Sequence, residues 1–136
     1  MVFRDISGNI IKDVSVYIIK WLKVHPKSEI YVGCDSQEVK MGINYVTVIC
    51  LYEIGKGAHV VHTKDTLTKP NKGKQTDYMY SKLWSEVVRA VNVADEIGDL
   101  GVKVTIHLDY NPDLSSCFEL YLNFQQTNYL KSVYQR

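Results

Sequence analysis

The 136-residue sequence is poor in the residues that mark fibrous, disordered or disulfide-rich proteins. It contains only 3 Pro and 8 Gly, while 46% of its residues are hydrophobic and 23% are charged. This composition excludes the collagen-like, low-complexity and disordered classes. The 3 Cys form no Cys-x-x-Cys pair and are too scattered for a zinc site. An odd number of Cys also fits a reducing compartment better than a secreted disulfide scaffold.

The chain also lacks an excess of either charge and a long apolar run. Lys and Arg number 16 and Asp and Glu number 15, which gives a formal net charge of +1. A nucleic-acid partner would therefore have to be attracted by a local patch or by bound metal. No stretch approaches the roughly eighteen apolar residues of a transmembrane helix. We expect residues 1–136 to form one soluble, cytoplasmic domain with no membrane contact.

Helical periodicity is present in two long segments. Apolar residues three and four positions apart predict helices over residues 13–24 and 76–99. The first helix should end at His25, because the proline that follows disfavours helical backbone there. A third helix candidate spans Ser115 to Thr127.

β-rich runs separate the predicted helices. They predict strands over residues 29–34, 43–52, 58–63 and 102–108, with a turn at 55–57 that makes the middle two a hairpin. Three strands followed by a helix and a fourth strand predict an α/β fold with a mixed sheet. The first three strands should be antiparallel, and the last should lie parallel to the first after the crossover helix.

Two aspartates follow predicted strands directly. Asp35 comes at the end of the first strand and Asp109 at the end of the last. If these strands are parallel neighbours, both carboxylates lie at the sheet edge where open α/β sheets bind ligands. Each aspartate alone, however, is more typical of a turn.

Glu86 is the carboxylate that makes a shared site more plausible. On the 76–99 helix it projects at the edge of the apolar arc, toward the sheet, while the neighbouring charged residues point toward solvent. A lone glutamate in such a place is usually a salt-bridge partner at the core boundary. Three carboxylates on strand, helix and strand make a better case together, because they could share a divalent metal ion.

The same residues carry a resemblance to a known family. Tyr-Val-Gly-Cys-Asp-Ser-Gln at 31–37, Gly-Lys-Gly at 55–57, Trp-Ser-Glu at 84–86 and Ile-His-Leu-Asp-Tyr-Asn-Pro at 106–112 are similar to the YkuK-like family of ribonuclease-H-like proteins. The resemblance implies a ribonuclease-H-like mixed sheet with flanking helices, and metal-dependent nuclease chemistry on DNA, RNA or a hybrid.

On this reading the nuclease works by a two-metal-ion mechanism. Asp35 would bridge two Mg²⁺ or Mn²⁺ ions, Glu86 would bind one of them, and Asp109 would bind the other or share it. The predicted reaction is hydrolysis of a phosphodiester bond.

One feature departs from the family pattern. Such nucleases usually add a fourth acidic residue or a histidine from a late helix, whereas residues 120–136 contain no Asp, Glu or His. Glu119 or Asp113 would have to substitute. The alternative interpretation is a catalytically inactive ribonuclease-H-like module that binds nucleic acid or protein.

Polar residues next to the three carboxylates are candidates for binding substrate. Ser36, Gln37 and Asn111 flank the aspartates and could hold phosphate or sugar oxygens, although ordinary turn chemistry explains them equally well. His107 stands two residues before Asp109, so both side chains face the same way on a strand. It could touch a phosphate, but a packed histidine is the more common case.

Two further segments bear on partners. The lysine-rich stretch 64–74 could reach phosphates, although such loops are usually only solvated. The helix candidate 115–127 carries Phe118, Leu122 and Phe124 at the end of a short chain. We expect some self-association, as a homodimer, through this helix.

Overall fold

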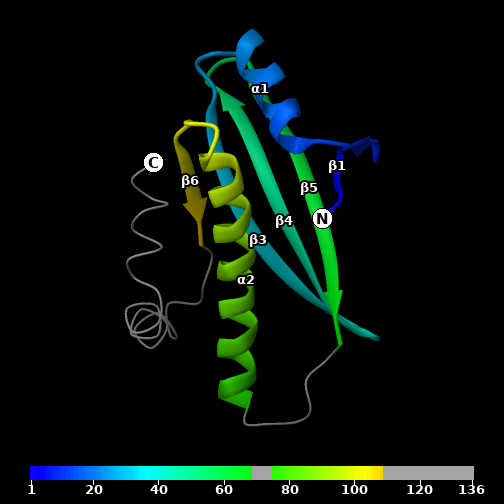
Figure 1. Cartoon of the computed structure of the whole chain (residues 1–136). Coiled ribbons are helices and arrows are strands. Elements are labelled where there is room, and N and C mark those ends of the chain that lie inside the picture. Colours follow the sequence, from blue (N-terminus) through cyan, green and yellow to red (C-terminus); the bar gives the residue numbers. More distant parts are fainter. Residues whose placement is uncertain (69–74, 109–136) are drawn as a thin grey trace.

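The computed structural model describes residues 1–68 and 75–108, which form a six-stranded sheet and two helices (Figure 1). In chain order the elements are β1 (Phe3–Asp5), β2 (Ile10–Ile11), α1 (Val14–Val24), β3 (Glu29–Val39), β4 (Gly42–Glu53), β5 (Gly57–Leu67), α2 (Gln75–Gly98) and β6 (Val104–His107).

The sheet is mixed, as predicted. Its strand order is β2-β1-β5-β4-β3-β6, and every neighbouring pair is antiparallel except β3 and β6, which are parallel. β3 therefore lies between the hairpin β4–β5 on one side and β6 on the other. The predicted α/β fold class with a parallel strand after the crossover helix is confirmed.

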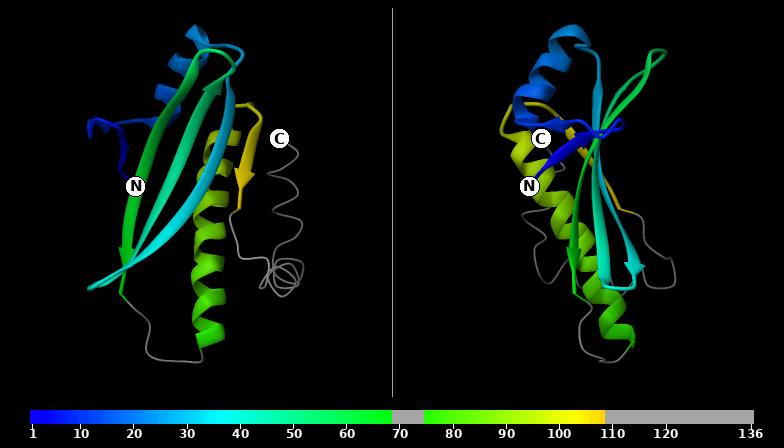
Figure 2. Two further views of the ribbon diagram at one scale, coloured as in Figure 1. Left: turned by 180° about the vertical axis from the view of Figure 1, so that it is seen from behind. Right: turned by 90° about the vertical axis from the view of Figure 1, so that its right-hand side faces the viewer.

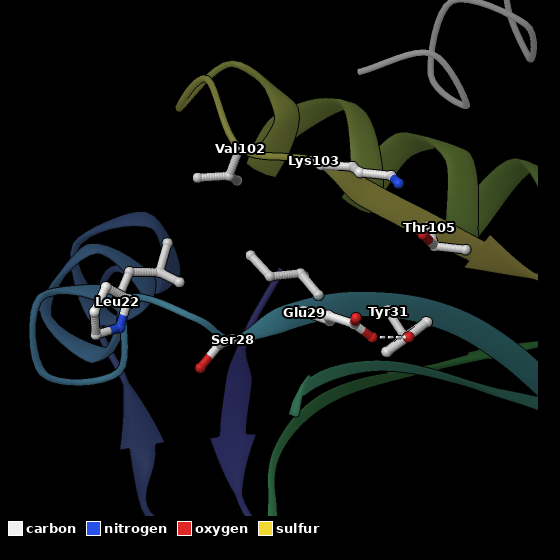
Figure 3. Close-up of a pocket in the computed structure, with 9 residues that line it drawn as sticks. Leu22, Ser28, Glu29, Tyr31, Val102, Lys103 and Thr105 are labelled. Carbon is white, nitrogen blue, oxygen red and sulfur yellow. Dashed lines mark hydrogen bonds between the residues drawn. The ribbon is translucent and has the colours of Figure 1, made fainter. Parts of the chain in front are cut away.

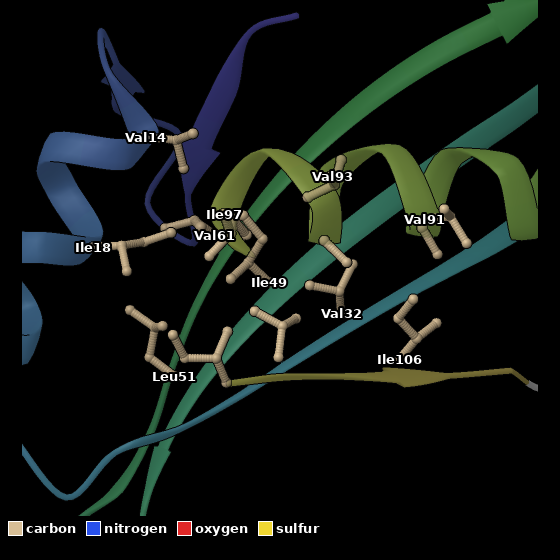
Figure 4. Packing of buried hydrophobic residues seen from close by; sticks show 14 of the residues in the cluster. Val14, Ile18, Val32, Ile49, Leu51, Val61, Val91, Val93, Ile97 and Ile106 are labelled. Carbon is tan, nitrogen blue, oxygen red and sulfur yellow. The ribbon is translucent and has the colours of Figure 1, made fainter. Parts of the chain in front are cut away.

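Both helices pack on the same face of the sheet, as the side view in Figure 2 shows. α1 starts after Asp13, whose carboxylate accepts a hydrogen bond from the Val16 amide at 3.1 Å. The core between helices and sheet consists of aliphatic side chains, among them Ile18 of α1, Ile49 of β4 and Ile97 of α2, all fully buried (Figure 4). This layer packs α2 against β3, β4 and β6.

Aromatic stacking connects α1 to the β4–β5 hairpin near its turn. The Trp21 ring stacks on His25 with a centroid distance of 4.2 Å and on His59 of β5 at 4.6 Å. His25 Nδ1 also lies 2.8 Å from a carboxylate oxygen of Glu53 at the end of β4. His59 is thus a packing residue, and alternation along β5 places His62 on the opposite face.

The strands β3 and β5 are longer than the sequence predicts, and this corrects the position of Asp35. β3 continues to Val39, so Asp35 lies inside the strand and not at its end. The reason is that residues 36–38 are polar and give no apolar signal, yet they pair with β4 throughout. Gly42 makes room for the end of β5, since a Cβ there would lie 2.0 Å from the Leu67 carbonyl oxygen.

The remaining differences concern short elements. β1 and β2 were not predicted; they extend the sheet beyond β5 and turn at Gly8, which has a positive φ of 89°. β6 is shorter than the predicted strand 102–108. The predicted helix 115–127 lies outside the described residues. Neither helix in the described part of the chain is long and apolar enough to cross a membrane.

Candidate functional site

The two faces of β3 differ in chemistry because side chains alternate along a strand. Even-numbered residues from Ile30 to Ser36 point toward α1 and α2, and we call this side of the sheet the helix face. Odd-numbered residues from Tyr31 to Gln37 point the other way, onto what we call the far face. The uninterrupted register with β4 keeps this alternation along the whole strand.

The far face carries a groove of about 550 Å³ around Asp35. Asp35 lies opposite Val46 of β4, and Val46 lies opposite Lys64 of β5, so the groove crosses three strands. The polar residues that line it are Asp35, Ser36, Gln37, Asn44, Lys64 and His107. A carboxylate, a lysine and a histidine therefore meet at one open, solvent-exposed surface.

Gly33 and the end of β6 shape this groove. Gly33 pairs with His107 and has no side chain, so no side chain fills the groove between Asp35 and His107. A Cβ at Gly33 would lie 3.5 Å from the His107 carbonyl oxygen, which is an ordinary contact. Within the described residues the pairing of β3 with β6 stops at this position, whereas β3 continues beside β4 to Val39. Asp35 stands just beyond the end of β6.

Glu86 approaches the same stretch of β3 from the helix face. Its side chain is only 9% exposed, which confirms that it points at the sheet. The Ser36 hydroxyl donates a hydrogen bond to the Glu86 carboxylate. Burial raises the pKa of Glu86, the Ser36 hydrogen bond acts against this rise, and the negative charge of Asp35 adds to it. The two carboxylates thus interact electrostatically although they project on opposite faces of the sheet.

An ion pair between α2 and β5 stands one helical turn beyond Glu86. Arg89 Nη2 and Nε contact the Asp65 carboxylate at 2.6 and 2.9 Å, and the guanidinium carbon lies 3.9 Å from the centre of the Tyr45 ring. The hydrogen bond to Asp65 raises the pKa of Arg89. This pair links α2 to β5 and β4 one helical turn from Glu86.

Most of the predicted site residues within the described segments gather here. Asp35, Ser36, Gln37 and His107 line the groove, and Glu86 contacts the Ser36 hydroxyl from the helix face of the same stretch of β3. Asp109 and Asn111 lie outside the described residues. Among residues 1–68 and 75–108, no three His, Cys, Asp or Glu side chains converge in the manner of a metal site.

Sequence reasoning missed how Asn44 and Lys64 reach the site. Lys64 was assigned to a polar loop, but β5 runs to Leu67 and carries this lysine onto the far face. Asn44 joins it because it lies opposite Gln37. Cys34 packs against the core, and burial raises the pKa of its thiol to about 11.

Comparison with known proteins agrees with this architecture. A family model described as Ribonuclease H-like matches residues 9–120, which is most of the chain. The chain belongs to the ribonuclease H-like family. Membership confirms the resemblance seen in the sequence and accounts for the mixed sheet with its parallel β3–β6 pair. No match was found among curated proteins or among solved structures.

Proposed function

We propose that this ribonuclease H-like protein is a metal-dependent nuclease whose site lies at the edge of β3 beside Asp35. The observation that carries the proposal is the exposed Asp35 carboxylate in a polar groove at the end of β6. His107 pairs with Gly33, and in sequence Asp109 follows His107 by two residues, just as Asp35 follows Gly33. The proposal therefore assigns Asp35 and Asp109 to one site.

The donor set fits a divalent cation. Carboxylate oxygens are the ligands that Mg²⁺ and Mn²⁺ prefer. The negative charge of Asp35 raises the pKa of Glu86, and a cation bound at Asp35 would offset this repulsion. In this proposal Asp35 and Asp109 hold the metal at the edge of β3 beyond the end of β6, and Glu86 would contribute from the helix face of the same stretch of β3. A bound cation supplies a nucleophilic water at neutral pH and stabilises charge on the leaving oxygen.

The remaining groove residues have roles in binding the substrate. Lys64 and His107 would contact phosphate oxygens from either side of Asp35, and Gln37 would hydrogen-bond a sugar or phosphate oxygen. Ser36 takes a different role from the one expected, because its hydroxyl already donates to Glu86. We assign it to positioning that carboxylate.

A cleavage assay tests the proposal. Single-stranded DNA, duplex DNA, RNA and an RNA–DNA hybrid are incubated with the purified protein in Mg²⁺, in Mn²⁺ and with a chelator. We expect cleavage of at least one substrate, lost on chelation and in Asp35→Asn. Glu96→Gln, an exposed carboxylate elsewhere on α2, is the matched control and should keep full activity. If the wild type cuts none of the substrates, the nuclease proposal is wrong.

A nucleic-acid-binding module without catalysis is the second candidate. It is favoured by the departure at the C-terminal end, where residues 120–136 offer no fourth acidic residue. Lys64, His107 and Gln37 would bind a phosphate backbone on this reading as well. Binding of oligonucleotides without cleavage in any metal would support it.

A further inference from the structure

A second hollow lies at the opposite end of the β3–β6 seam. It has a volume of about 510 Å³ and opens at the amino ends of β3 and β6 (Figure 3). Among its lining residues are Leu22, Glu29, Tyr31, Val102, Lys103 and Thr105. An apolar wall, a carboxylate, a phenol and an ammonium group therefore share one cavity.

The second hollow adjoins the groove at Asp35 along the far face. Tyr31 lines the hollow and His107 lines the groove, and their rings touch edge to face with centroids 4.9 Å apart. Tyr31 pairs with Thr105, and Gly33 pairs with His107, so these side chains follow one another along the same seam on the far face. From Tyr31 to Asp35 the strand advances about 13 Å at its usual rise of about 3.3 Å per residue.

The chemistry of the hollow suits a nucleotide better than an isolated phosphate. The exposed Lys103 offers a positive charge for a phosphate, but Glu29 in the same hollow would repel a second anion. A carboxylate instead accepts hydrogen bonds from base amino groups and sugar hydroxyls. The Tyr31 hydroxyl donates a hydrogen bond to Glu29, which fixes both side chains and raises the pKa of Tyr31.

We propose that the second hollow is a subsite for an unpaired nucleotide of a single-stranded nucleic acid whose scissile phosphate lies at Asp35. This proposal rests on the proposed function. Tyr31 stacks on the base, Lys103 binds a phosphate, and Glu29 hydrogen-bonds the base or the sugar. Duplex bases are paired and stacked on each other, so only a single strand can place a base on Tyr31. The Tyr31–His107 pair separates this subsite from the cleavage site.

Fluorescence anisotropy with labelled oligonucleotides tests the subsite. All variants are made in the Asp35→Asn protein with Mg²⁺ present, so that the strand stays intact. Tyr31→Ala should weaken binding of a long single strand about tenfold, because base–aromatic stacking is lost. Lys103→Ala should weaken it several-fold and reduce the slope of log K against log salt by about one. Neither substitution should change the affinity for a dinucleotide that occupies only the groove at Asp35.

Two matched variants separate this role from a structural one. Tyr31→Phe keeps the ring and should retain most of the parent's affinity, since it loses only the hydrogen bond that orients Glu29. Lys23→Ala removes an exposed lysine of α1 that lines neither hollow, and should leave affinity and salt slope unchanged. Should Tyr31→Ala fail to fold, the exposed Lys103 still decides the question through its salt slope.

Each contrary result has a distinct meaning. If single strands bind but Tyr31→Ala and Lys103→Ala match the parent, the subsite is wrong while the proposed function stands. If duplex binds equally well and shows the same losses, the assignment to a single strand is wrong. If no nucleic acid binds and the wild type cuts none, the proposed function fails and the subsite fails with it.

Discussion

The two faces of β3 have different roles: one packs in the core, and the other borders the candidate site. On the helix face Ile30 and Val32 are buried under α1 and α2, and they join the aliphatic core. On the far face Gly33 and Asp35 border an open polar groove. Consecutive residues of β3 therefore lie alternately in the apolar core and in the polar groove. Apart from Ser36 and Glu86, substitutions should affect folding on the helix face, and metal or nucleic-acid binding on the far face.

The largest expected effect is the difference in the free energy of unfolding between substitutions of Ile49 and of Val48 on β4. Ile49 is fully buried on the helix face, whereas Val48 is partly exposed on the far face. Ile49→Ala should lower the free energy of unfolding by about 2–5 kcal/mol, because it leaves a cavity in the core. Val48→Ala should cost about 1 kcal/mol or less. Urea denaturation measures both, and equal losses would contradict the division between the faces.

The second effect is a loss of cleavage activity without a loss of stability. Asp35→Asn should reduce cleavage by about 100-fold or more, since ligation of the metal contributes several kcal/mol to catalysis. Its stability should be unchanged or slightly higher, because the amide oxygen can still accept the 2.9 Å hydrogen bond from the Ser36 amide. Cleavage rates and urea midpoints are measured on the same preparation. A variant that loses stability in proportion to activity would show that Asp35 has a structural role.

The third effect tests the contact that links the two faces. Ser36→Ala removes the donor that lowers the pKa of Glu86, so this pKa should rise further. Activity at neutral pH should fall about 10- to 100-fold, as for other residues that orient a metal ligand. The acidic limb of the pH–rate profile should move to higher pH, because Glu86 must be ionised to bind metal. Ser36→Thr keeps a hydroxyl and should restore the profile; an unshifted profile in Ser36→Ala would contradict the positioning role.

The smallest effect is a gain in stability. Burial raises the folded-state pKa of Glu86 above its ordinary value of 4.5, so its ionised form costs stability at neutral pH. Glu86→Gln should therefore unfold at a higher urea concentration than the wild type at pH 7. The difference should shrink as the pH falls through the folded pKa, where the wild type becomes protonated and neutral. A difference that does not depend on pH would point to packing and not to charge.

The sequence predicted the parts of the molecule that depend on local periodicity. Both helices and the inward direction of Glu86 follow from apolar residues three and four positions apart. The polar ends of β3 and β5 could not be predicted in this way, because their strand structure depends on pairing with β4. The convergence of Lys64, Asn44 and Asp35 depends on the register of three strands. β1 and β2 were missed for a similar reason: they are short and are held by β5 and by each other.

Mn²⁺ bound in crystals, located by its anomalous scattering, tests the proposed metal site most directly, since it reports the ion and its ligands together. We expect an ion at the end of β6 beside the β3 edge, with an Asp35 oxygen at a coordination distance of about 2–2.5 Å. The Asp35→Asn protein should show much weaker density there. An ion bound only elsewhere, for example by His25 and Glu53, or no ion at saturating Mn²⁺, would contradict the assignment of Asp35 as a metal ligand.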